Sequence, residues 1–319
     1  MKKIIIAALF LLVFNSCKTE SQLEKEIANI DVNVNVERFD LAFSNAKPSD
    51  LPKLKETFPF LFSKRIPDSI WVQQMTDTLQ VRLSSEVEKT FSDFDGIYDD
   101  IHSLFQHLKY YDKTFTEPRI VTVKSNVDYR NKTIVTDTIA IIALDTYLGS
   151  DHEFYADIPR YITQNMDKSQ IVSDLAGNYA VKYIFQPERK TLLDEMVYFG
   201  KQLYFKDMVI PFKTDAEKIG YSQAQLDWAT ANESQIWSYF IEREMLYSTD
   251  HDLPSRFIAD APFSKFYLEL DNESPGRIGQ YIGWQIVRAY MKNNDVPLME
   301  MLQKDADEIF KKSKFKPRK

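Results

Sequence analysis

The segment RIVTVKSNVDYRNKTIVTDTIAIIALD, residues 119–145, decides the fold class because it is the clearest β-region of the chain. Residues 119–124 are rich in β-branched side chains, residues 126–133 have turn composition, and residues 137–145 form a nearly continuous apolar run. This order predicts a β-hairpin or two neighbouring strands. Residues 31–39 (DVNVNVERF) alternate between apolar and polar side chains, which is typical of a half-buried strand, and we expect this segment near Val34 to join the sheet.

Helical patterns surround this β-region. Residues 49–112 are expected to be helical, with Pro52 and Pro67 near helix starts, where proline is tolerated. Ser222 is a good N-cap for one of the later helices. These later helices are expected at roughly 152–165, 169–184, 190–206, 222–247, 275–292 and 296–312. The sequence therefore predicts an α+β fold that is mostly helical, with a small sheet.

The first residues have the pattern of a bacterial lipoprotein signal. Lys2 and Lys3 precede an apolar run of 11 residues, 4–14, which is too short for a membrane span. The chain's single cysteine, Cys17, directly follows the small residue Ser16, as lipoprotein processing requires. We expect residues 1–16 to be a cleaved signal peptide, 17–29 a lipidated polar tether and 30–319 a single globular domain. An ordinary cleaved signal with an incidental cysteine is the alternative.

Composition restricts the partners. Removing residues 1–16 takes away two lysines and no acid, so the formal charge changes from -7 to -9. This balance argues against nucleic acid and against an anionic membrane surface as partners. With Cys17 lipidated, no thiol remains for a disulfide, so a packed core must stabilise the domain. The Lys-rich end KKSKFKPRK is expected to be solvated or frayed.

No zinc or cofactor motif is present in the sequence. A β-hairpin followed by paired helices is an arrangement used by zinc peptidases, in which two histidines at i and i+4 bind the metal. None of the four histidines forms such a pair, and the helix expected after the sheet has Asp174 and Asn178 at that spacing, which are poor zinc ligands. We therefore expect no metal and no cofactor.

Catalytic motifs of other kinds are also missing. There is no Gly-x-Ser-x-Gly elbow and no glycine-rich phosphate loop. Paired carboxylates could hydrolyse glycosides, but most of the 47 acidic residues are expected to be solvated on helix faces. The sequence thus predicts no catalytic residue.

Residues 261–291, APFSKFYLELDNESPGRIGQYIGWQIVRAYM, contain the best candidate for a binding groove. Residues 272–274 and Pro275 have the composition of a helix start. Glycines inside a helix cost about 1 kcal/mol each, so they often allow a close approach to the backbone. Close packing between helices is the simpler interpretation. The alternative is a groove where exposed N–H groups and Arg277 receive a carboxylate or a peptide terminus. The candidate groove residues are Asp271, Gly276, Arg277, Gly279, Gly283 and Trp284.

Three long runs resemble the gliding-motility lipoprotein GldB family of the Bacteroidetes. They are TLLDEMVYFGKQLYF (191–205), IGYSQAQLDWATANESQIWSYFIEREMLYSTD (219–250) and residues 261–291, and the resemblance extends over the whole mature chain. The lipoprotein signal at Cys17 agrees with that family. The resemblance implies a role in gliding, in a machinery linked to type IX secretion, with other gliding or secretion proteins as partners.

The segment PGRIGQYIGWQIV also resembles predicted zinc-dependent peptidases. That resemblance implies a zincin-like (metallopeptidase-like) scaffold, but no zinc ligand of that group has a matching residue here. Our hypothesis is a peptidase-like scaffold that has lost its metal and kept its groove.

Two functions remain open from the sequence. The first is a lipid-anchored, non-enzymatic envelope component, with its domain in the periplasm, that binds other proteins or a peptide. The alternative is an envelope hydrolase that cleaves peptide or glycan at a carboxylate site.

Overall fold

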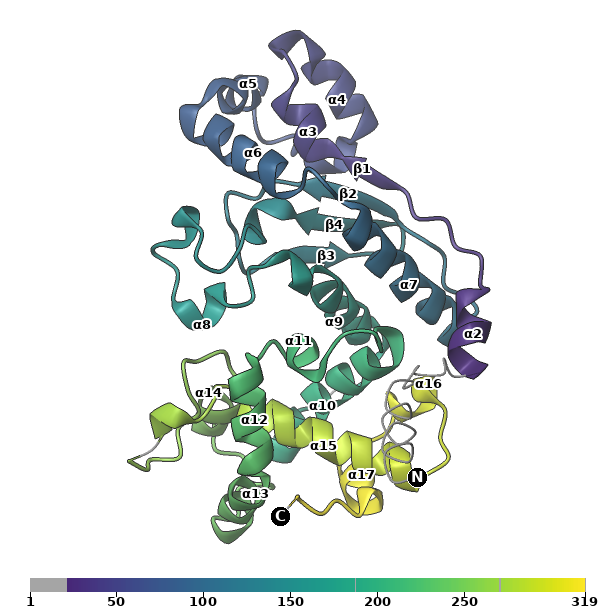
Figure 1. Cartoon of the computed structure of the whole chain (residues 1–319), viewed down its shortest axis with the longest axis vertical. Helices are drawn as coiled ribbons and strands as arrows, with labels where there is room; N and C mark the ends of the chain where they lie inside the picture. The colour runs from purple at the N-terminus through teal and green to yellow at the C-terminus, as the bar shows by residue number, and fades with distance from the viewer. Residues whose placement is uncertain (1–21, 187, 270, 319) are drawn as a thin grey trace, which may run out of the picture.

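The computed structural model describes residues 22–186, 188–269 and 271–318, and Figure 1 shows their arrangement. The predicted signal peptide and Cys17 lie outside these residues. The β-sheet lies in the upper half of Figure 1, a group of helices fills the lower half, and one helix, α9 (Ile171–Tyr183), lies between them. The α+β fold, mostly helical with a small sheet, is confirmed.

The sheet has the strand order β1-β2-β4-β3. Its strands are β1 (Val36–Arg38), β2 (Arg119–Val123), β3 (Thr133–Val135) and β4 (Ile139–Ala143). β2 and β4 are parallel neighbours, and the hairpin is formed instead by β3 with β4. Two neighbouring strands were one of the predicted alternatives, whereas β3 falls in and beyond the segment assigned to a turn.

The predicted strand over 31–39 is mostly wrong. Only β1 is strand, and it pairs in parallel with β2 from the register Val36↔Ile120 onward. The Asn35 carbonyl still accepts a hydrogen bond from the Ile120 N–H at 3.1 Å. Because β2 begins at Arg119, residues 31–34 extend past its end and form no strand. Their apolar alternation still has a use, since Val32 and Val34 are buried in the core.

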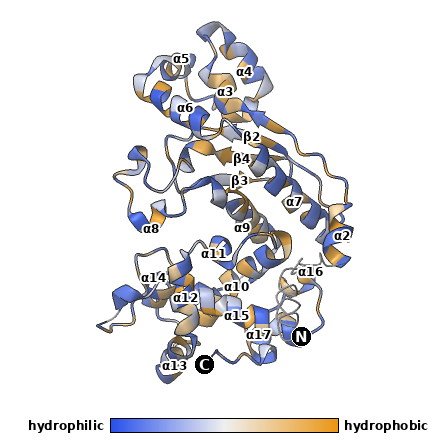
Figure 2. Ribbon diagram, viewed as in Figure 1, coloured by the Kyte–Doolittle hydropathy of each residue, from blue (hydrophilic) through white to orange (hydrophobic). Residues whose placement is uncertain are grey.

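Both faces of the sheet are covered. Successive side chains of a strand point to opposite faces, and in β2 Ile120 contributes to the main core while Val121 contributes to a smaller one. The main core includes the inner face of α7 (Asp95–Tyr111). The smaller, aromatic core is covered by α3 (Phe39–Ser44), α4 (Leu51–Thr57), η2 (Pro59–Leu61) and α5 (Asp68–Thr76). The short helix η1 (Pro48–Asp50) precedes α4, and α6 (Thr78–Thr90) lies beside α3 and α5. Figure 2 shows hydrophobic and hydrophilic residues mixed along these helices, and Ile70, Leu79 and Val81 are among the exposed apolar side chains.

The lower half is organised around α10 (Leu192–Val209) and α15 (Ile278–Asn293). Their backbones approach so closely that a Cβ at Gly283 would lie 1.8 Å from the Met196 carbonyl oxygen, and one at Gly200 would lie 2.3 Å from the Gly283 carbonyl oxygen. Glycine is therefore required where these two helices cross.

The remaining helices follow the prediction in part. Ser222 caps α12 (Gln223–Ala231) by accepting a hydrogen bond from the Gln225 N–H, as expected, but the predicted helix 222–247 breaks at Asn232 into α12 and α13 (Glu233–Glu242). Little of the predicted helix 152–165 is α-helical. The remaining elements are η3 (Leu144–Thr146), η4 (Glu153–Tyr155), α8 (Arg160–Thr163), η5 (Lys168–Gln170), α11 (Asp215–Ile219), α14 (Asp252–Phe257), η6 (Asp271–Glu273), α16 (Leu298–Met301) and α17 (Ala306–Ser313).

Both ends of the described chain are docked onto the fold. Part of the predicted tether forms α2 (Gln22–Ala28), which packs on α7: Ile27 is buried, and the Gln106 side-chain amide donates to the Ala28 and Ile30 carbonyls, both at 2.9 Å. The folded body thus includes residues 22–28 of the segment 17–29.

At the other end, the described lysines of the tail are exposed, as the solvated alternative predicted, but the tail is not frayed. The Phe315 and Trp237 ring centres lie 5.1 Å apart, and the Arg318 N–H donates to the buried Glu233 carboxylate at 2.9 Å. Aromatic packing and a buried acceptor hold the tail against the fold.

Candidate functional site

Two adjoining cavities form a single cleft between the two halves of the molecule. Their volumes are about 330 and 570 Å³, within the range of small-ligand sites. The cleft is lined by α9, α10, the end of α11, the loop before β3 and the residue before α15. We call it the basic cleft, because five of the eight residues shared by both cavities are cationic: Arg130, Lys132, Lys206, Lys218 and Arg277, together with Asp174, Asp260 and Ile219.

Lys206 extends from α10 into this cleft. Its ammonium donates to the Ser173 hydroxyl at 3.0 Å and to the Lys218 carbonyl at 2.9 Å. Both acceptors are neutral, and no carboxylate of the described chain lies within hydrogen-bond distance. Burial lowers the pKa of Lys206 to about 8, Asp174 acts in the opposite direction, and the positive charges of Arg277 and Lys132 lower it further. A third N–H of this ammonium has no partner among the described residues.

Asp174 connects α9 to the β-region. Its carboxylate forms an ion pair with Lys132 at 2.5 Å and accepts a hydrogen bond from the fully buried Tyr147 hydroxyl at 2.8 Å. One turn later on α9, the Asn178 amide donates to the Thr133 carbonyl at 2.8 Å. The two positions that the sequence placed where a peptidase would have zinc ligands therefore both lie on the cleft wall, in contacts with the sheet.

Arg277 is held from three sides. It donates to the Gly220 carbonyl at 3.0 Å, lies 3.3 Å from the Asp260 carboxylate, and covers the Tyr221 ring at 5.4 Å. Its backbone has a φ of 61°, in the left-handed region, so the chain turns sharply just before α15. A guanidinium has five N–H donors, so this side chain can hold its position and still offer donors to a ligand.

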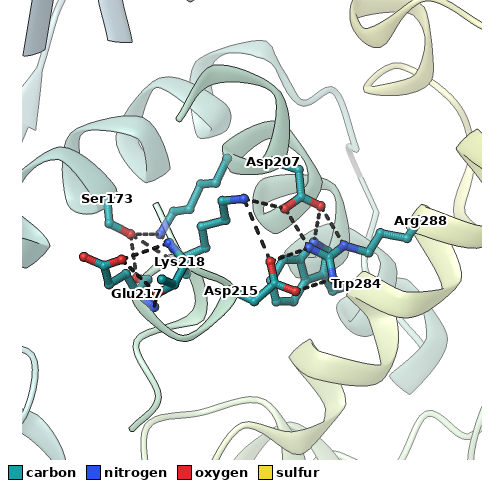
Figure 3. A network of polar contacts seen from close by, with 9 residues as sticks. Ser173, Asp207, Asp215, Glu217, Lys218, Trp284 and Arg288 are labelled. Carbon is teal, nitrogen blue, oxygen red and sulfur yellow. Dashed lines mark hydrogen bonds and ion pairs between the residues drawn. The ribbon is translucent and has the colours of Figure 1, made fainter. Parts of the chain in front are cut away.

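Lys218 lines the cleft, but acidic residues outside it balance its charge. Its ammonium lies 3.1 Å from Asp207, which Arg288 also contacts at 2.7 Å. Figure 3 shows Arg288 bridging Asp207 and Asp215 beside Trp284. Although burial raises the pKa of Asp215, the hydrogen bonds and charge of Arg288 lower it below the usual range. This network joins α10, α11 and α15 into one wall.

The structure separates the six candidate groove residues of 261–291. Only Arg277 lines the basic cleft. Gly276, Gly279 and Gly283 are packing positions, where an added Cβ would meet neighbouring backbone within 3 Å. Trp284 is fully buried, with its indole N–H donating to Asp207 at 2.9 Å. Asp271 accepts hydrogen bonds from the Tyr267 and Leu268 N–H groups and borders a separate apolar pocket.

The expected start of the last long helix at Pro275 is also wrong, because α15 begins at Ile278. Its first N–H donates to the buried Ser264 hydroxyl at 3.1 Å, so this N-terminal donor is used inside the protein. Residue Ser274 bonds to Ser264 and to the Asp271 carbonyl instead of capping the helix.

Sequence reasoning missed Lys132 and Lys206 as site residues. Lys206 had one usable signal, namely a lysine within the apolar run LYFKDMV of residues 203–209. The contact of Lys206 with α9, where a Cβ at Gly177 would lie 3.4 Å from the Lys206 Cε, is visible only in the structure. Nor does the sequence signal indicate that Lys132, far away in sequence, completes the site.

Lys206 and Ser173 have the atom types of a Ser–Lys catalytic dyad. However, the Ser173 side chain is 1% exposed, and its hydroxyl donates to the Glu217 carbonyl at 3.0 Å. A nucleophile must reach its substrate, and this hydroxyl is directed into the protein.

Two further properties concern residues 22–318 as far as they are described. No group of three or more His, Cys, Asp or Glu side chains is arranged to hold a metal ion. None of the described helices combines the length and apolar character that a bilayer crossing needs.

The comparison with protein families identifies the family of this chain. The model of the family described as gliding motility protein GldB matches residues 20–317, nearly the whole chain. Neither a curated protein nor a solved structure matches significantly.

Proposed function

The chain belongs to the GldB family of gliding motility lipoproteins, and from this premise we propose that it acts by binding a protein or peptide segment in the basic cleft, without catalysis. The family's lipoprotein name supports a membrane-anchored location in the cell envelope. We further propose that Cys17 carries the lipid, that the domain lies in the periplasm, and that its partners are gliding or type IX secretion proteins.

One observation carries the binding proposal. The basic cleft is a wide cavity whose polar groups are fixed by protein contacts, as in Lys132 with Asp174 and Arg277 with Gly220. Preformed sites with a few fixed polar groups are typical of ligand recognition. The buried and inward-donating Ser173 supports binding over Ser–Lys hydrolysis.

The hypothesis of a zincin-like scaffold without zinc concerns the same cleft. The helix that would hold zinc ligands in a peptidase is α9, and its residues Asp174 and Asn178 line the cleft here while bonding to other protein groups. This arrangement supports a scaffold that kept its groove without a metal. One zinc per chain, bound stoichiometrically in purified protein and removed only by a chelator, would overturn it.

The test combines site-specific crosslinking with motility. Benzoylphenylalanine replaces Val181, which is 48% exposed and lines the cleft, or Leu79, which is 56% exposed on α6 as the control. In a gliding bacterium that lacks its own copy, we expect crosslinks to another envelope polypeptide from position 181 and none of the same kind from position 79. Lys206→Met should reduce gliding while the protein level stays unchanged.

The opposite pattern would refute the proposal. Normal gliding of a folded Lys206→Met variant, with no crosslink from position 181, would exclude the basic cleft as the working site. Turnover of a peptide or peptidoglycan library by the purified protein, lost when one carboxylate is removed, would favour the hydrolase alternative.

A further inference from the structure

The charges that face the basic cleft do not balance. Lys218 is paired with Asp207 outside the cavity, which leaves Arg130, Lys132, Lys206 and Arg277 against Asp174 and Asp260. Two positive charges therefore remain inside a cavity of a chain whose formal charge is -7. An anion that enters the cavity would compensate these two charges, and its attraction would be least screened by water at Lys206, the most deeply buried of the four cations.

Donor geometry indicates how such an anion would be held. Lys206 uses two of its N–H groups on Ser173 and Lys218 and has a third available. Arg277 keeps N–H donors beyond those that contact Gly220 and Asp260. A carboxylate has two acceptor oxygens, which can bind an ammonium and a guanidinium together.

The cleft also has an apolar part next to these cations. Val181, Phe199 and Leu203 line the smaller cavity, on α9 and α10. A free phosphate or sulfate would leave this wall in contact with water. A peptide end presents a carboxylate directly beside a side chain, so it can use the cations and the apolar wall together.

We propose that the basic cleft binds the C-terminal α-carboxylate of a polypeptide, with Lys206 and Arg277 holding the carboxylate and the wall of Val181, Phe199 and Leu203 receiving an apolar last side chain. This inference rests on the proposed function, since it names the ligand of the same cleft. Capture of chain ends by fixed donors is a known mode of peptide recognition. The negative net charge of the protein favours this compact anionic group over an extended polyanion.

The test uses the full-length lipidated protein in nanodiscs. Two libraries of randomised, N-acetylated pentapeptides are offered to the immobilised protein, one with free C-terminal acids and one with C-terminal amides, and retained peptides are quantified by mass spectrometry. We expect at least tenfold more retention of the acids, with apolar residues enriched at the last position. Lys206→Met and Arg277→Gln should abolish the difference between acid and amide.

Lys168→Met is the matched control, because it removes one exposed lysine of η5 that does not line the cleft. It should retain acids as the unmodified protein does. Circular dichroism melting of each variant separates loss of binding from loss of folding. Methionine keeps an unbranched apolar side chain at position 206 of α10 and removes only the charge. Lys206→Met therefore tests the proposal even if Arg277→Gln fails to fold.

Other outcomes overturn the inference in distinguishable ways. Equal retention of acids and amides would refute the carboxylate assignment but leave peptide binding intact. Binding of inorganic phosphate by calorimetry, without retention of either library, would identify a small oxyanion as the ligand instead. If neither library nor phosphate binds while position 181 still crosslinks in cells, the carboxylate assignment fails and the proposed function stands.

Discussion

The pKa of Lys206 determines how binding in the basic cleft should depend on pH. Its ammonium faces Ser173 and Asp174 of α9, and Lys132 and Arg277 across the cavity, and burial lowers its pKa to about 8. Below that pH the group is charged and attracts an anion, and above it the charge is lost. Peptide affinity should therefore be constant between pH 6.5 and 7.5 and should fall by up to about tenfold by pH 9.

Fluorescence anisotropy with a labelled peptide acid measures this change. Lys206→Met should bind weakly and show no such fall, because the titrating group is gone. A decline of the same size in the methionine variant would mean that another group is responsible.

Single residues also define how far sequence reasoning extends. Arg277 could be selected, because an arginine beside glycines at a helix start is visible in one short segment. Lys132 and Lys206 could not be paired, because their proximity depends on how α9 joins the sheet to α10. A lysine in an apolar helix indicates burial, but the chemistry of its surroundings comes only from tertiary contacts.

The crossing of α10 and α15 yields a prediction about stability. Gly283→Ala would place a Cβ 1.8 Å from the Met196 carbonyl oxygen, so the two helices must separate. We expect a loss of at least about 3 kcal/mol in the free energy of unfolding, which is the upper end of the range typical of overpacked core substitutions. Urea unfolding followed by circular dichroism measures it.

Gly96→Ala on α7 is the control, because nothing lies within 4 Å of a Cβ there. This variant should be more stable by about 0.5 kcal/mol, since alanine favours a helix over glycine. Equal effects of the two substitutions would show that the close approach of α10 and α15 is not tight in solution.

Whole elements were predictable where local chemistry decides them, as with the capping of α12 by Ser222. They were not predictable where a neighbour decides them. Residues 31–39 alternate like a strand, but only β1 (Val36–Arg38) pairs with β2, because β2 begins at Arg119 and is too short to pair with the earlier residues. Likewise, residues 126–133 have turn composition, but β3 begins at the last of them, Thr133, and pairs with β4.

For the molecule as a whole, the docked tail predicts that the C-terminus contributes to stability. Removing residues 315–319 removes the ring contact between Phe315 and Trp237. It also removes the hydrogen bond from the Arg318 N–H to the buried Glu233 carboxylate. We expect a loss of about 2 kcal/mol in the free energy of unfolding, from apolar contact and an unpaired buried charge.

Thermal and urea unfolding of the shortened chain measure the loss. Phe315→Ala should reproduce part of it, whereas Lys316→Ala, at an exposed position, should change stability by less than about 0.5 kcal/mol. An unchanged stability of the shortened chain would mean that the tail is detached in solution.

Helix α2 fixes how high above the bilayer this protein can operate. With acyl chains on Cys17, as proposed, helix α2, which packs on the body of the protein, lies only five residues further along the chain, from Gln22 onward. Five fully extended residues span at most about 18 Å. The domain therefore stays close to the lipid surface and can contact only partners that come near that membrane. The polypeptide end that binds in the cleft must therefore also lie near the membrane, so the lipid anchor limits which proteins can reach the cleft.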